Sequence, residues 1–244
     1  MAGGRELFGA SASGTVRGTR HAAVSSSGNL TDRCALIALF EAVAREEGWQ
    51  PGDQLRAYQD HSVYFALHVE KTLAGGLQLV LPDAAGQLPC QRVWPELDLC
   101  EESGVAHVAV LALRREFRGK GQGDLFWRLV IALWRHCVLV GIYTLYLEVT
   151  PRVLPLYQRL GWPLQVCGPE RLHWGEPCLI CSLDVRQVAG ALAERAICSA
   201  TYRDILARAV APRAAGQPAK TTAGSRNPRT RSKVAALSKN ETAE

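Results

Sequence analysis

The chain has 244 residues, of which 48% are hydrophobic and 21% are charged, and its formal net charge at pH 7 is +5. This length and apolar content exclude a wholly disordered chain and allow a single buried core. The longest apolar run, over residues 124–140, contains Arg128, Arg135 and His136, so no transmembrane segment is expected. The eight cysteines are scattered and no apolar secretory signal precedes them, which predicts reduced thiols in a cytoplasmic protein.

Composition changes at both ends of the chain. Residues 1–31 are mainly Gly, Ser and Ala with scattered Arg and no apolar block, which predicts a disordered tail. Residues 211–244 predict a second disordered tail with seven basic and two acidic residues, so its charge of +5 equals that of the whole chain. Such a tail could contact nucleic acid or an acidic partner. A solvated tail without a specific partner is the simpler interpretation, so nucleic acid is not an expected partner.

Between the tails, the hydrophobic pattern predicts one domain over residues 32–185, followed by a C-terminal helix over 186–210. The expected order is a helix (34–48), two strands (63–68 and 73–81), a strand (105–113), a long helix (124–140), a strand (144–149), a short helix within 151–162 and two closing strands (164–166 and 178–183). That order predicts an α+β fold with a mixed, mostly antiparallel central sheet flanked by helices.

A glycine-rich turn, Arg-Gly-Lys-Gly-Gln-Gly at residues 118–123, joins the strand before it to the long helix. Such a turn points free backbone N–H groups and the positive end of the helix dipole at one place, and its glycines allow φ > 0. Arg118 and Lys120 add positive charge. The turn therefore predicts a phosphate site, although its spacing fits neither the P-loop nor the Rossmann fingerprint. An ordinary connection in a basic surface loop is the alternative.

A second motif follows at Leu156-Tyr157-Gln158-Arg159-Leu160-Gly161-Trp162, a short helix closed by a glycine. With Arg-x-x-Gly-x-Gly before it, in this order and at this separation, the chain resembles the GNAT (GCN5-related N-acetyltransferase) superfamily. The resemblance implies that strands 105–113 and 144–149 splay apart around the pantetheine arm of acetyl-CoA or acyl-CoA as co-substrate. It implies cofactor-binding roles for Leu111, Leu113, Arg118, Gly119, Lys120, Gly121, Gln122 and Gly123.

For catalysis, the resemblance assigns Tyr157 as the general acid, with a core tyrosine as the alternative. The general base is left open between two residues. His107 lies on the strand where many superfamily members place a glutamate, and an imidazole accepts a proton near neutral pH. Its alternative is a buried strand histidine. Glu148 lies on the opposite face of its strand from Leu147 and Val149, and its alternative is a solvent-facing carboxylate.

Residues 34–184 resemble, more loosely, the acyl-homoserine-lactone synthases and the N-acyl amino acid synthases. The features that carry this resemblance are Leu39-Phe40, Gly48-Trp49, Asp53, Asp60, Val63-Tyr64, Gly75-Gly76-Leu77-Gln78-Leu79, Pro82 and Trp94-Pro95-Glu96-Leu97. They imply a fatty acyl thioester donor, on CoA or acyl carrier protein, with Trp49, Tyr64 and Trp94 as acyl-tunnel or core residues. His107-Val108-Ala109-Val110 and Gln78 stand where the lactone synthases carry charged groups, which argues against homoserine-lactone formation.

The sequence thus predicts an N-acyltransferase that moves an acyl group from a thioester, preferably on CoA, to a small-molecule amine by direct attack. The alternatives are a fatty acyltransferase of the N-acyl amino acid or acyl-homoserine-lactone synthase type and a catalytically silent acyl-CoA sensor. No metal is expected, because the single Cys-x-x-Cys, Cys178 to Cys181, lies in a strand-like run without a second ligand pair nearby.

Overall fold

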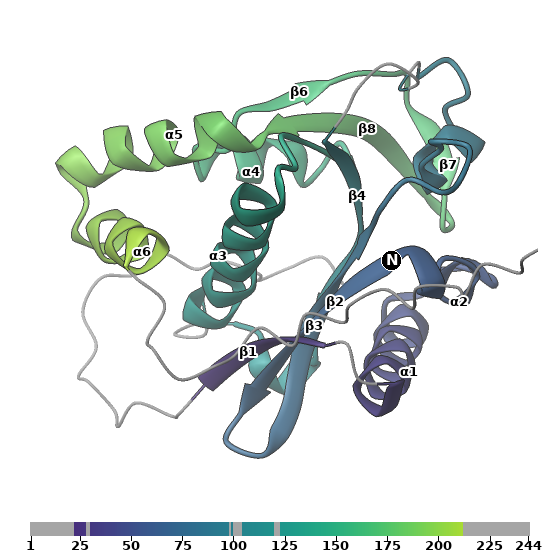
Figure 1. The fold of residues 1–244 in the computed structure, drawn as a ribbon, viewed down its shortest axis with the longest axis horizontal. Coiled ribbons are helices and arrows are strands. Elements are labelled where there is room, and N and C mark those ends of the chain that lie inside the picture. The colour runs from purple at the N-terminus through teal and green to yellow at the C-terminus, as the bar shows by residue number, and fades with distance from the viewer. Residues whose placement is uncertain (1–21, 28–29, 98, 100–103, 120–122, 212–244) are drawn as a thin grey trace, which may run out of the picture. The chain divides into compact units, whose positions relative to one another are not determined.

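The computed structural model describes residues 22–27, 30–97, 99, 104–119 and 123–211. Its centre is one sheet with the strand order β1-β2-β3-β4-β5-β8-β6, and β7 pairs with the first residues of β8 (Figure 1). Among these strands, β4 and β5 run parallel, and the other neighbours are antiparallel. The strands are β1 (Ala22–Ser27), β2 (Ser62–Val69), β3 (Thr72–Val80), β4 (Val105–Leu113), β5 (Thr144–Val149), β6 (Leu164–Val166), β7 (Arg171–His173) and β8 (Glu176–Asp184).

Helices cover both faces of this sheet (Figure 1). The α-helices are α1 (Leu30–Glu47), α2 (Gln54–Ala57), α3 (Gly123–Val140), α4 (Leu154–Arg159), α5 (Val185–Cys198) and α6 (Ala200–Val210). The first two bury their apolar residues on one face, whereas α3, α5 and α6 share the largest core cluster on the other. None of the described helices is long and apolar enough to span a membrane. The mixed α+β sheet expected from the sequence is confirmed.

The structure corrects the expected ends of the domain. Residues 22–27, expected in the N-terminal tail, form the edge strand β1, which pairs antiparallel with β2. These residues are small or polar, so backbone pairing rather than an apolar pattern holds the strand. The single helix expected over 186–210 is two helices that meet at Ser199, whose backbone is extended. Residues 1–21 and 212–244 lie outside the described residues, so tails there stay a prediction.

A β-bulge interrupts β4 beside the point where β5 leaves it. Successive residues of β3 pair with Val108 and Val110, so Ala109 is an extra residue on β4. Before the bulge, even-numbered residues of β4 pack toward α3, and after it odd-numbered residues do. His107 is therefore directed to the same face as Val110, the face that carries α1.

Candidate functional site

Strands β4 and β5 open into a wedge. Their parallel ladder runs from the Val105–Thr144 pair to the Val108–Leu147 pair and stops there, although β4 continues to Leu113. Beyond that point the backbone groups of β4 on the β5 side are free of this ladder and can pair with a ligand. A cavity of about 290 Å³ fills the gap. The splayed strands implied by the superfamily resemblance are therefore present.

One end of this cavity is apolar. Val130, Leu133 and Trp134 of α3 line it together with Val185 and Val188 of α5. The indole Nε1 of Trp134 donates a hydrogen bond of 3.0 Å to the backbone carbonyl of Val185, which fixes α5 against α3. A hydrocarbon chain of a ligand can lie at this end without leaving a polar group unpaired.

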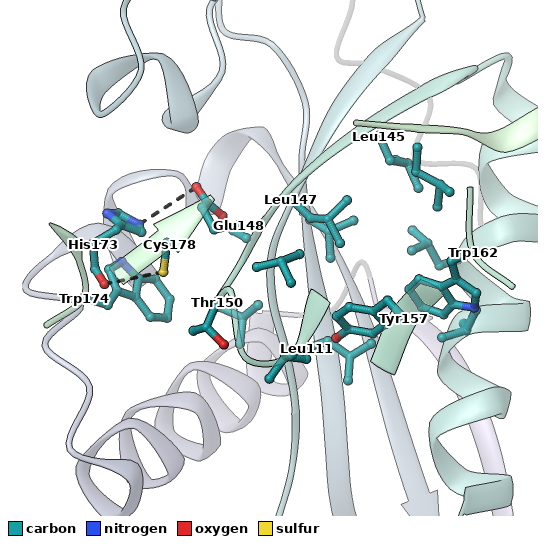
Figure 2. Close-up of a pocket in the computed structure, with 18 of the residues that line it drawn as sticks. Leu111, Leu145, Leu147, Glu148, Thr150, Tyr157, Trp162, His173, Trp174 and Cys178 are labelled. Carbon is teal, nitrogen blue, oxygen red and sulfur yellow. Dashed lines mark hydrogen bonds and ion pairs between the residues drawn. The ribbon is translucent and has the colours of Figure 1, made fainter. Parts of the chain in front are cut away.

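The other end of the cavity is polar and aromatic. Its lining includes Glu148 of β5, Glu176 of β8, His173 and Trp174 at the β7–β8 turn, and Trp49 just after α1. Figure 2 shows Glu148, His173 and Trp174 gathered together, apart from Tyr157 and Trp162. The two ends therefore suit different chemical groups of one reaction.

A second cavity, of about 140 Å³, adjoins the first. Trp49, Leu111, Val153 and Tyr157 line both, so the cavities meet beside α4. The smaller cavity also contacts the end of β4 and the start of α3 through Leu113, Phe117, Arg118, Gly119, Gly123 and Phe126. The structure thus brings Leu111 and Leu113 together with the described part of the predicted phosphate turn.

The glycine-rich turn is described only at its two ends. Residues 120–122 (Lys120, Gly121 and Gln122) lie outside the described residues, so their expected role stays a prediction. Gly119 has a φ of +102°, a conformation that favours glycine. Arg118 forms an ion pair with Glu47 of α1, and its Nε donates a hydrogen bond of 2.7 Å to the carbonyl of Leu113. Its guanidinium therefore already has an anionic partner in the protein.

Tyr157 lies where the two cavities meet. Its ring stacks on Trp162 with the centroids 4.9 Å apart and the planes at 17°. Figure 2 shows its hydroxyl pointing away from Trp162, toward the middle of the cavity. Burial raises the pKa of Tyr157 to about 12, so the phenol is protonated at neutral pH. The hydroxyl can therefore donate a hydrogen bond to a ligand atom at the meeting point.

Glu148 lies between two histidines. Its Oε2 is 2.7 Å from Nε2 of His107, and its Oε1 is 3.9 Å from Nε2 of His173. The Glu148 side chain is only 10% exposed, so the alternative of a solvent-facing carboxylate is wrong. His107 is 3% exposed and stands behind Glu148, outside the residues that line the cavity. Of the two expected base candidates, Glu148 is thus the one that a ligand can reach.

The surroundings of this carboxylate set the charge of the site. Burial alone would raise the pKa of Glu148. The charge and the hydrogen bond of His107 lower this pKa, and so does the charge of His173. Together these interactions outweigh the effect of burial, so the pKa of Glu148 lies below its ordinary value. Burial lowers the pKa of His173 more than the Glu148 charge raises it, and His107 lowers it further. At neutral pH the cavity therefore presents a carboxylate beside a neutral imidazole.

Sequence reasoning did not place His173 and Trp174 at the site. They belong to the β7–β8 hairpin, whose two-residue turn, Trp174-Gly175, has φ values of +51° and +85°. Strand β7 has three residues, too few for a period-2 pattern to predict it. The signal in the sequence that could have predicted this turn is the pair of an aromatic residue and a glycine, Trp174-Gly175. Trp174 Nε1 donates a hydrogen bond of 2.8 Å to Gln54 Oε1, which holds the turn against α2.

The three aromatic residues expected at an acyl tunnel or in the core divide between these positions. Trp49 lines both cavities. Tyr64 and Trp94 are 0% exposed and belong to two separate core clusters outside both cavity linings. Their role is therefore to fill the core.

The Cys-x-x-Cys pair lies on β8. Cys178 packs into the cluster around Trp94, whereas Cys181 packs into the cluster under α3. A spacing of three residues on a strand places two side chains on opposite faces, so these two thiols cannot hold one ion. The described residues contain no cluster of side chains suited to a metal ion.

Comparison with known proteins gives a family and a fold. The family model of the N-acyl amino acid synthase FeeM matches residues 38–184. A search of curated protein sequences finds no match. The structure of FeeM, an N-acyl amino acid synthase from uncultured soil microbes, is similar with a TM-score of 0.60 and 16% identity, over 71% of this chain and 96% of that chain.

Two further solved structures share the fold. BjaI, a CoA-dependent acyl-homoserine lactone synthase solved with SAM and isopentyl-CoA, has a TM-score of 0.53 and 16% identity, over 75% of this chain and 85% of that one. A Lactobacillus plantarum protein described as an N-acetyltransferase has a TM-score of 0.50 and 20% identity, over 67% of this chain and 98% of that one. At these identities the structural likeness establishes the GNAT-like fold alone.

The family match covers more than half of the chain and includes every element that builds the site except α5. It contains the β4–β5 wedge, the glycine-rich turn, the helix of Tyr157, and Glu148 with both of its histidines. The chain is therefore an N-acyltransferase that belongs to the FeeM family of N-acyl amino acid synthases.

Proposed function

We propose that this protein transfers an acyl group from acyl-CoA directly to the nitrogen of a primary amine. The observation that carries the proposal is the meeting, at Tyr157, of a passage from the glycine-rich turn, an apolar compartment and a compartment with a carboxylate. In an acyl transfer, the thiol arm of the donor, its acyl chain and the amine must approach one carbon atom from three directions, and these three compartments provide a place for each. Burial raises the pKa of Cys178, the cysteine that lines the larger cavity, to about 11, which disfavours a cysteine nucleophile and supports direct attack.

In this proposal the donor enters along the smaller cavity. Its pyrophosphate lies against residues 118–123 at the N-terminus of α3, where the helix dipole favours an anion. Its pantetheine arm pairs with the backbone of β4 beyond Val108, where the ladder to β5 has ended. The acyl chain then lies in the apolar end, between α3 and α5. Acyl carrier protein presents the same arm and is the alternative donor.

The reaction follows from the groups at the junction. An ammonium must first lose a proton, which goes to solvent, before the nitrogen lone pair can attack the thioester carbon. The N–C bond forms, the nitrogen passes a second proton to Glu148, and collapse of the tetrahedral intermediate breaks the C–S bond. The thiolate takes its proton from Tyr157, which is reprotonated from Glu148 through solvent. His107 holds the carboxylate of Glu148 in position.

The pKa of Tyr157 decides how it acts. A free thiol has a pKa near ~8.5, so full proton transfer from a phenol with a pKa of about 12 is uphill by roughly 3.5 units, or roughly 5 kcal/mol. A hydrogen bond from the hydroxyl to the departing sulfur does not carry that cost and is strong in a dry site. Tyr157 therefore stabilises the departing sulfur by a hydrogen bond, and its proton passes to the thiolate together with reprotonation of the phenol from Glu148 through solvent, so that no phenolate is left.

Calorimetric titration with CoA, acetyl-CoA and a long-chain acyl-CoA tests the donor. We expect all three to bind and Gly119→Val to weaken each by about tenfold, because a side chain at a φ of +102° costs ~1–3 kcal/mol unless the turn moves. Gly86→Val is the matched control, since Gly86 has a φ of +76° in open space outside both cavities.

Each outcome of this titration separates two explanations. An equal loss of affinity in both variants would show general strain instead of a phosphate turn. Binding of an acyl carrier protein, without binding of any CoA ester, would select the alternative donor. Binding of the CoA esters without thiol release, in the presence of any primary amine, would leave the silent sensor as the function.

Val188→Trp should shorten the acyl chain that the enzyme prefers. Val188 is buried on α5 at the apolar end of the cavity. Each methylene that no longer fits forfeits about 0.8 kcal/mol, so the loss of two lowers kcat/KM for a long-chain acyl-CoA about tenfold relative to acetyl-CoA. Steady-state thiol release with both donors measures this ratio. The control is Val138→Trp, which changes an exposed residue of α3. If Val188→Trp leaves the ratio of the two kcat/KM values unchanged, the acyl chain does not lie at this end of the cavity.

A further inference from the structure

Asp124 lies at the start of α3, beside the place proposed for the phosphates of the donor. It is in the first turn of the helix and directly follows Gly123, which lines the smaller cavity. An acidic residue in the first turn stabilises a helix, but it also repels an anion that binds at the same end. Burial would raise the pKa of Asp124, but the hydrogen bonds and charges of Arg128 and Arg208 outweigh burial and lower it. The carboxylate is therefore charged at neutral pH, and its charge opposes the binding of phosphates unless a cation cancels it.

Two arginines hold this carboxylate. Nε of Arg128, one turn further along α3, donates a hydrogen bond of 2.6 Å to its Oδ2 atom. Arg208 of α6 forms an ion pair with its Oδ1 atom. Asp124 lines neither cavity, although Gly123 before it and Phe126 after it both line the smaller one. The carboxylate is thus held outside the cavity by cations from two different helices.

Two ion-paired groups lie at this end of the proposed donor path. Arg118 and Glu47 pair with each other, so their charges cancel. Asp124 with Arg128 and Arg208 has two positive charges and one negative charge, which leaves a net charge of +1. Three further charged residues, on the connection between β4 and the glycine-rich turn, are exposed and screened by solvent: Arg114, Arg115 and Glu116. Without Arg208 both ion-paired groups would be neutral, so Arg208 supplies their positive excess.

The fold fixes Arg208 beside α3. Arg135 of α3 donates hydrogen bonds to backbone carbonyls at the end of α6, of 2.9 Å to Ala209 and of 2.6 Å to Ala211. The last carbonyls of a helix have no partner within the helix, so these bonds hold the end of α6 on α3. The family match ends at residue 184, so α6 lies outside it. This C-terminal helix therefore adds a charge to a site whose other residues belong to the family match.

We propose that Arg208 is a positioning residue for the donor, which acts with Arg128 to cancel the charge of Asp124 and leaves one positive charge in excess beside the phosphates of CoA. The inference rests on the proposed acyl transfer from acyl-CoA and adds α6 to its donor site. The three side chains are 35–43% exposed, so the dielectric constant of water applies. Loss of one unit charge about 8 Å from a doubly charged pyrophosphate should then weaken the binding of CoA about fivefold at low ionic strength. At ~0.5 M salt, where the Debye length is about 4 Å, the effect should fall below about twofold.

Calorimetric titration of the full-length protein with CoA, at low and at high salt, tests the proposal with two single variants and their combination. At low salt, Arg208→Ala should bind CoA about fivefold more weakly than the wild type, whereas Asp124→Asn should bind it about fivefold more tightly. The double variant keeps the net charge of +1 through Arg128, so its affinity should be within about twofold of the wild type. The matched control is Arg203→Ala, which removes the same charge from an exposed residue of α6 that donates a hydrogen bond to the carbonyl of Ala196. Its affinity for CoA should also be within about twofold of the wild type.

The sign of the Asp124→Asn effect separates a role in charge from a role in folding. Both single variants break the ion pair between α3 and α6, so a purely structural role would weaken the binding of CoA in both and would overturn the proposal. A double variant as weak as Arg208→Ala would also overturn it, because Arg208 would then contact the donor directly. If the expected pattern is found but acetyl-CoA releases no thiol with any primary amine, the acyl transfer is wrong and the role of Arg208 stands. A wild type that does not bind CoA overturns both CoA as the donor and the role of Arg208.

Discussion

Tyr157→Phe should lower kcat by about 100- to 1000-fold while the affinity for acyl-CoA stays within about twofold. The phenyl ring keeps the stacking on Trp162, so packing at the junction of the two cavities is preserved. Only the hydroxyl is lost, and with it the hydrogen bond to the departing sulfur. Because that bond strengthens as charge develops on sulfur, its loss falls on the chemical step rather than on donor binding. Steady-state thiol release and calorimetry measure the two quantities separately.

The matched control for this variant is Tyr143→Phe. Tyr143 lies just before β5, is 46% exposed and lines neither cavity, so removal of its hydroxyl should leave kcat unchanged. Thermal unfolding of both variants shows whether either change disturbs the fold. If Tyr157→Phe turns over as fast as the wild type, Tyr157 is a core tyrosine and its catalytic assignment is wrong.

Glu148→Gln should lower kcat/KM for the amine by about 100- to 10,000-fold, the range for loss of a positioned general base. Glutamine has nearly the same shape and can still accept the hydrogen bond from His107, so the loss reports the carboxylate charge. Binding of acyl-CoA should change little, because its proposed path runs along the smaller cavity to the apolar end of the larger one, away from Glu148. Glu170→Gln, an exposed carboxylate outside the site, is the control. If Glu148→Gln keeps the wild-type kcat/KM, Glu148 is not the general base, and His173 is the next candidate.

The difference in the free energy of unfolding between the wild type and Glu148→Gln should depend on pH. The pKa of Glu148 in the folded protein lies below its ordinary value of 4.5, so its charge stabilises the fold above that pH. The contribution is lost as the pH falls through the folded pKa. The free energy of unfolding of the wild type, measured in urea, should therefore lose its advantage over Glu148→Gln as the pH is lowered from neutral to below 4.5. A difference that stays constant across this range would contradict the attraction between Glu148 and its histidines.

The elements that build the wedge could be predicted from the sequence. Strands β4 and β5 begin and end where the apolar runs do, and α3 begins one residue before the expected helix. Such runs are local and contain β-branched or long apolar residues, so propensity and burial act in the same direction. Strand β1 has no such run, because its small and polar residues depend on pairing with a strand almost forty residues later in the chain.

By itself the sequence indicated the family and two of the proposed functional groups. The glycine-rich turn and the helix of Tyr157 are contiguous motifs, and their function depends on local spacing, which a sequence displays directly. Only the tertiary structure decided how the polar end of the larger cavity is built. His107 reaches Glu148 through the parallel register of β4 and β5, while His173 arrives on a short hairpin of β8. Register and hairpin packing join residues far apart in the chain, so no local pattern records them.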